Sequence, residues 1–231
     1  MELYEFDRKL RILIMDAIER IEVSLRTAVT YHLARAYGPF AHCDQKNFHP
    51  EFKHGDWIDR LNDEAEKSRE TFIEHYKEKY DGFPRLPIWM ASEVMTFGSL
   101  SRLYEGMLIP DKDRVCAHWK IPRSVMLSWL RTLTFIRNTC AHHARLWNRE
   151  LACAPTMPLA KHGWPLKETP VQKRIFCVLI ILRHLLDGQH AANPWQPEVT
   201  NLIDQIAVNK FFRDSMGLPE NWKAHPRWAI V

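Results

Sequence analysis

The apolar residues near the N-terminal end recur at steps of three and four, which is the spacing of one face of an α-helix. They are Leu10, Leu13, Ile14, Ala17, Ile18, Ile21, Leu25, Ala28 and Val29. The same period appears in most later segments, and no run alternates apolar and polar residues as a half-buried strand does. The sequence therefore predicts an all-α protein, a helical bundle with additional C-terminal helices.

Glycine and proline indicate where the first helices end. The first helix should end near Tyr37, because Gly38-Pro39 cannot continue it. Residues 38–55 are rich in histidine, proline and glycine, and we expect them to form a loop. A second helix should follow, with Asp56 as its N-cap and apolar residues at helical spacing as far as Tyr76.

Further helices are expected at 88–97 and 100–107, divided by Gly98-Ser99, from Arg123 onward, at 171–186 and at 197–212. Residues 153–170 contain four prolines and predict an irregular connection. We therefore divide the chain into a helical core at 1–152 and a C-terminal part at 153–231 whose helices pack on that core.

Composition limits the class of protein. With 231 residues, 46% of them hydrophobic, the chain can bury one large core, and its net charge of +4 permits nucleic-acid binding without indicating it. Five cysteines without regular spacing, and no secretory signal, predict a cytoplasmic protein. The longest apolar run, Ile175–Leu182, is far shorter than the roughly 20 residues that span a bilayer, so we expect no membrane association.

The densest group of reactive side chains lies at 137–149, which reads RNTCAHHARLWNR. Its polar members are Arg137, Asn138, His142, His143, Arg145, Asn148 and Arg149. We expect them on consecutive helical turns, with Trp147 in the core. Arginine stays charged and suits a phosphate, and histidine can exchange a proton near neutral pH. The segment therefore predicts a site that binds a phosphate and moves a proton beside it.

Helical geometry separates the two strongest candidates in this segment. Arg137 and His142 are five positions apart, which offsets them by about 140° on one helix. Two copies of the chain facing each other in a dimer would bring such residues together, and so would a sharp bend after His142. A single Arg-x4-His pair is expected by chance in a chain with this many arginines and histidines, so the spacing alone does not identify the site.

The sequence around these residues is more specific than the Arg-to-His spacing. RN-x-CAHH-x-RLWNR resembles the core of the Abi-like abortive-infection proteins (AbiD/AbiF type), members of the HEPN superfamily of helical ribonuclease domains. The opening LYEFDRKLRILIMDAIERIEVSLRTAVTYHLARAYGPF and the block LPIWMASEVMTFGSLSRLYEGM at 86–107 are also similar to that family, in the same order. Members usually begin with a further helical segment before the block that opens here at Leu3, and we expect this chain to lack it.

The resemblance implies a HEPN-like core and a metal-independent endoribonuclease in which the 2′-hydroxyl of RNA attacks the adjacent phosphate. By this resemblance Arg137 holds the phosphoryl oxygens, and His142 is the general base or acid, with His143 as the alternative if the longer gap applies. Asn138 would orient Arg137 or a histidine, or contact a phosphate oxygen. The family also implies a homodimer with a composite active site. Because an active ribonuclease would be toxic to its own cell, we also expect a regulator, either an RNA or a protein antitoxin.

The basic residues after the histidines, Arg145 and Arg149, together with Asn148, are expected to follow an RNA backbone. A zinc site is not expected, because the set Cys140, His142, His143, Cys153 and His162 fits no common ligand spacing. We expect no other cofactor. Two alternatives remain open: a non-catalytic RNA-binding or interaction module, such as one that binds a small non-coding RNA, and a structural helical dimer with a vestigial motif.

Overall fold

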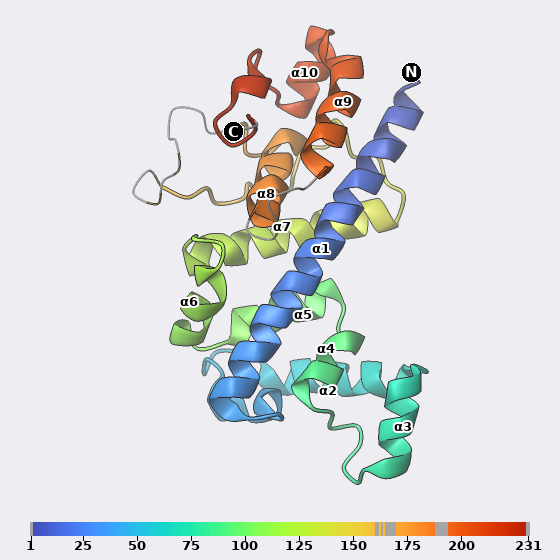
Figure 1. Cartoon of the computed structure of the whole chain (residues 1–231), viewed down its shortest axis with the longest axis vertical. Coiled ribbons are helices and arrows are strands. Elements are labelled where there is room, and N and C mark those ends of the chain that lie inside the picture. Colours follow the sequence, from blue (N-terminus) through green and yellow to red (C-terminus); the bar gives the residue numbers. More distant parts are fainter. Residues whose placement is uncertain (1, 160–161, 163, 165–169, 188–193, 230–231) are drawn as a thin grey trace. The chain divides into compact units, whose positions relative to one another are not determined.

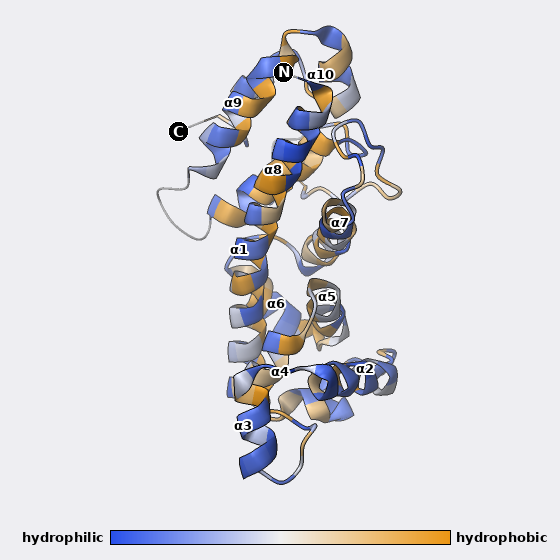
Figure 2. Cartoon of the chain, turned by 90° about the vertical axis from the view of Figure 1, so that its right-hand side faces the viewer, coloured by the Kyte–Doolittle hydropathy of each residue, from blue (hydrophilic) through white to orange (hydrophobic). Residues whose placement is uncertain are grey.

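The computed structural model describes residues 2–159, 162, 164, 170–187 and 194–229 (Figure 1). Within those ranges the regular secondary structure is helical, apart from one isolated bridge between Phe48 and Met107. Hydrophobic and hydrophilic residues occur together along most of the helices in Figure 2, as amphipathic helices require. The predicted all-α fold is confirmed.

The chain forms two compact units, one from residues 1–23 and 118–231 and the other from residues 24–117. The long helix α1 (Leu3–Tyr37) contributes to both. It ends where Gly38 adopts a positive φ, as the sequence predicts. The boundary at residue 152 stays a prediction.

The first unit contains α7 (Arg123–Ala141), α8 (Ile175–Asp187), α9 (Trp195–Ala207), α10 (Lys210–Met216) and a short 3-10 helix (Trp222–Ala224). Helix α8 is apolar on nearly all sides, which suits a helix that is enclosed by the protein core. Every residue from Ile175 to Leu182 is buried, as predicted. The start of α1 packs here too, and the indole of Trp195 on α9 donates to the Leu13 carbonyl at 2.6 Å.

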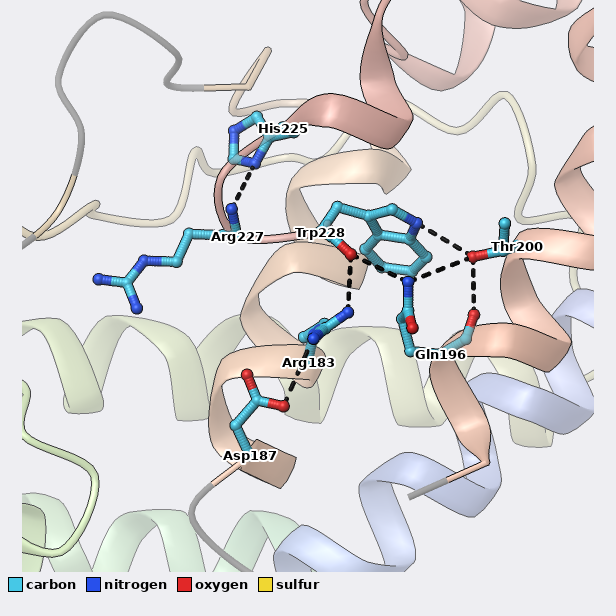
Figure 3. Close-up of polar contacts among 7 residues, drawn as sticks. All are labelled: Arg183, Asp187, Gln196, Thr200, His225, Arg227 and Trp228. Carbon is cyan, nitrogen blue, oxygen red and sulfur yellow. Dashed lines mark hydrogen bonds and ion pairs between the residues drawn. The ribbon is translucent and has the colours of Figure 1, made fainter. Parts of the chain in front are cut away.

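The last described residues are tied to α8 and α9 (Figure 3). The carbonyl of Trp228 accepts from Arg183 on α8 at 2.7 Å and from Gln196 on α9 at 2.9 Å. The Trp228 indole donates to Thr200 at 3.1 Å, so this buried aromatic side chain has the polar partner that an indole needs. Residues from three parts of the sequence thus meet in the core of this unit.

The second unit contains the rest of α1, two 3-10 helices (Ala41–Cys43 and Gln45–Asn47), α2 (His54–Lys67), α3 (Thr71–Lys79), α4 (Ile88–Val94), α5 (Phe97–Gly106) and α6 (Ile109–Ala117). Helix α2 packs on α4 and α5. The Tyr37 hydroxyl at the end of α1 donates to Asp111 on α6 at 2.7 Å. Helix α6 was not among the predicted helices.

Three of the predicted divisions between helices are wrong, each beside a small polar residue. The helix expected to run from Asp56 to Tyr76 divides into α2 and α3, where the Ser68 hydroxyl accepts from the Glu70 N–H at 3.3 Å. Asp56 is not an N-cap, because α2 begins two residues earlier and Asp56 lies in its first turn. A serine side chain that binds nearby backbone competes with the helical hydrogen bonds, which explains the break.

The other two errors have the same cause. Helices α4 and α5 divide at Met95-Thr96 and not at Gly98-Ser99, because Thr96 caps α5 by accepting from the Ser99 N–H at 3.1 Å. The helix expected at 197–212 divides into α9 and α10, because Asn209 caps α10. Helix α8 begins at Ile175 rather than near residue 171.

Candidate functional site

The motif lies at the C-terminal end of α7 and in the segment that follows it. Arg137 and Asn138 are in the last helical turns, and His142 is the C-cap with φ −87° and ψ 13°. The expectation of two further helical turns is wrong, because Arg145, Asn148 and Arg149 lie beyond the end of α7. Of the two geometric solutions, the bend after His142 is present, and the dimer stays a prediction.

His143 holds the backbone geometry of this bend. Its φ is +55°, in the left-handed region. Its N–H donates to the Cys140 carbonyl and the Ala144 N–H donates to the Thr139 carbonyl, both at 3.0 Å. This pair of bonds is a Schellman motif, in which glycine usually occupies the position of His143. A left-handed residue with a side chain costs about 1–2 kcal/mol, and such strain is concentrated at functional sites.

Arg137 and His143 line one groove of about 690 Å³. Its α7 side consists of these two residues with Cys140 and Ala141, and its other side is the segment of α1 from Arg8 to Glu22. His142 is exposed and is not among the lining residues. The structure therefore brings the motif arginine together with the alternative histidine.

The charges in the groove are mixed. Arg137 is half-buried, and in its described polar contact it donates to the side-chain oxygen of Asn138 at 3.4 Å. No carboxylate pairs with Arg137 among the described residues, so its charge is available to an anion. On the α1 side, Asp16, Glu19 and Glu22 line the groove together with Arg8 and Arg11, and Asp16 is paired with Arg20 at 3.0 Å; carboxylates disfavour a polyanion beside them. A phosphate is therefore best placed at the α7 end.

Asp7 supports the motif, and sequence reasoning missed it. The side chain is 4% exposed, and its Oδ1 accepts from the N–H groups of Leu146 at 2.9 Å and Trp147 at 2.8 Å. Its other oxygen pairs with buried Arg11. One carboxylate thus fixes the segment after the histidines to the start of α1. The Asp7/Arg11 spacing of four is visible in the sequence, but it indicates only a helical ion pair.

The remaining motif residues differ in exposure. Trp147 is buried, as predicted. Arg145 is exposed, and its carbonyl accepts from the Nε–H of Arg149 at 2.8 Å. The Asn148 carbonyl accepts from Arg174 at 3.1 Å. Burial raises the pKa of the Cys140 thiol to about 12, so this cysteine is neutral and unreactive at physiological pH.

Nowhere in the described ranges do three or more histidine, cysteine or acidic side chains form a group that could hold a metal ion. The described helices include none with the length and apolar character needed to cross a bilayer.

Comparison with known proteins places this arrangement in a family. The family model described as "Abi-like protein" matches residues 1–148, from α1 through Asn148. No curated protein and no solved structure matches the chain significantly. Because the family model covers well over half of the chain, including both sides of the groove, this protein belongs to the Abi-like family.

Proposed function

We propose that this protein is a metal-independent endoribonuclease of an abortive-infection system that defends a cell against phage. Membership of the Abi-like family suggests the defence role. The observation that carries the enzymatic part is that Arg137 and His143 line the same groove. Arg137 is a cation without a carboxylate partner in the described structure.

The reaction follows from these two groups. A neutral histidine takes the proton of an RNA 2′-hydroxyl, and the 2′ oxygen bonds to the adjacent phosphorus. The bond from phosphorus to the 5′ oxygen breaks, and that oxygen receives a proton from a histidine in its cationic form. The products are a 2′,3′-cyclic phosphate and a 5′-hydroxyl. Arg137 neutralises the added negative charge on the non-bridging oxygens.

The proposal assigns proton transfer to the adjacent histidines. His143 is the member that shares the groove with Arg137, whereas the family pattern selects His142. A homodimer would supply a second pair, so that one histidine acts as base and another as acid. The exposed Ile12 beside the groove offers apolar surface for such a contact. A nuclease of this kind needs a regulator, which we propose to be an RNA or a protein antitoxin.

A non-catalytic RNA-binding module in the cytoplasm is the second candidate. It is favoured by the carboxylates of Asp16, Glu19 and Glu22, which line the same groove and disfavour a scissile phosphate next to them. In that case the exposed Arg145 and its neighbours would bind RNA without cutting it.

The decisive experiment incubates purified protein with mixed RNAs in excess EDTA and identifies the ends of the products. We expect cyclic phosphate and 5′-hydroxyl ends, lost in Arg137→Ala and in at least one of His142→Ala and His143→Ala. No cutting by wild type, with retained RNA binding, favours the second candidate. Activity that requires added Mg²⁺ or Mn²⁺ contradicts the metal-independent mechanism.

A further inference from the structure

An exposed aromatic side chain lies beside the motif on α10. Phe211 is 65% exposed, and its ring centroid is 6.3 Å from that of buried Trp147. Phe212 lies 5.4 Å from the same indole, so the three rings form one cluster in which Phe211 is the exposed member. The Asn209 side chain accepts from the Phe211 N–H at 2.8 Å and holds this residue in the first turn of α10.

Three segments meet at this cluster, and we call them together the α10 surface: residues 145–151, 171–174 and 208–217. The Leu151 N–H donates to the Lys173 carbonyl at 2.9 Å, and Arg174 donates to the Asn148 carbonyl. Gly217 lies so close to Arg174 that an added Cβ would come within 2.5 Å of it. The surface is therefore continuous across segments distant in sequence.

The α10 surface carries an excess of positive charge. Its two carboxylates are already paired, Glu150 with Lys173 at 3.9 Å and Asp214 with Lys210 at 2.7 Å. Its arginines are Arg145, Arg149, Arg174 and Arg213.

The described partners of these arginines are carbonyl oxygens, which leave the positive charge uncompensated. Arg149 donates to the Arg145 carbonyl, and Arg213 donates to those of Ala207 at 2.8 Å and Val208 at 3.0 Å. Arg145 forms no ion pair among the described residues. Four arginines on the same surface as one exposed ring are a strong attraction for a polyanion that carries aromatic groups.

We infer that the α10 surface binds single-stranded RNA next to the cleavage site, with Phe211 stacked on a base and the arginines on the neighbouring phosphates. This inference rests on the proposed function and names residues beyond position 148, where the family match ends. Arg145 is only two positions from His143, so a strand bound here leads directly to the motif. The large apolar side chains that this surface exposes are Phe211, Val208 and Val171, too little for the core of a stable protein interface.

The test measures binding of a strand that cannot be cut. A short 2′-O-methyl oligonucleotide lacks the attacking hydroxyl, and a second version with abasic residues keeps the phosphates but lacks the bases. Phe211→Leu removes the ring but keeps an apolar side chain, and Phe211→Trp keeps a stacking surface. Trp89→Leu is the matched control, because Trp89 is an aromatic residue 52% exposed in the other unit.

We expect Phe211→Leu to weaken binding of the intact strand roughly 5- to 150-fold and to leave binding of the abasic strand unchanged. Phe211→Trp and Trp89→Leu should bind both strands like wild type, and circular dichroism should show all variants folded. Wild-type binding by Phe211→Leu, or equal weakening on both strands, overturns the inference. So does a change of oligomeric state in light scattering with unchanged RNA affinity, which would identify a protein contact.

These results are separable from the proposed function. If Phe211→Leu loses only base-dependent binding while wild type cuts no RNA, the surface is confirmed and the nuclease proposal fails. If wild type cuts RNA and Phe211→Leu binds both strands normally, the nuclease proposal stands and the surface inference fails.

Discussion

Replacing His143 with glycine is expected to stabilise the protein while it removes an imidazole from the groove. His143 has φ +55° at the Schellman position, where a side chain costs about 1–2 kcal/mol and glycine costs nothing. Glycine also gains freedom in the unfolded chain, which offsets about 0.4–1 kcal/mol of that advantage. The mid-range values of the two effects leave a net gain of about 0.8 kcal/mol, or a rise in Tm of roughly 2–3 °C for a chain of this size.

Thermal unfolding followed by circular dichroism measures this gain, and RNA cleavage is assayed on the same samples. His142→Gly is the matched control, because His142 has an ordinary φ of −87° and glycine there should lower the Tm. His143→Ala should not raise the Tm, because alanine keeps the left-handed strain. A Tm that falls in His143→Gly would refute the strain argument and show that the imidazole itself stabilises the fold. Full cutting by this variant would exclude His143 from catalysis.

Three further predictions follow from other residues. Asp7→Asn should lower the free energy of unfolding by roughly 3–5 kcal/mol, because Arg11 stays buried without its partner. A loss of less than about 1 kcal/mol in a urea titration would contradict the anchoring role of Asp7. Burial, with the charges of Arg85 and His54, lowers the pKa of His42 to about 4. Between about pH 6.5 and pH 4, His42 is therefore protonated in the unfolded chain but neutral in the folded chain. The free energy of unfolding should therefore fall as the pH drops from 6.5 toward 4. In urea titrations at several pH values, His42→Gln should make this pH dependence weaker. An unchanged pH dependence in His42→Gln would show that His42 is not its source. Arg137→Ala should both stop cutting and flatten the salt dependence of RNA binding as a phosphate contact is lost, whereas an unchanged slope would place the phosphate elsewhere.

The sequence by itself determined the features that depend on residues near one another along the chain. The apolar period of α1 predicted its buried face, and Gly38-Pro39 predicted its end at Tyr37. The residue types of the motif indicated the chemistry. The breaks at Ser68, Thr96 and Asn209 were missed, because a polar residue within a periodic segment is consistent with either a cap or a solvent-exposed position.

Only the tertiary structure decided which groups meet. Arg137 and His143 share a groove because the helix ends in a left-handed residue, and no periodicity argument places a histidine there. Asp7 binds backbone N–H groups 139 and 140 positions away, and any residue except proline can supply such a donor, so the sequence carries no sign of the contact. Phe211 joins the motif through Trp147 for the same reason: contacts between distant segments depend on how whole helices pack, and local pattern does not encode them.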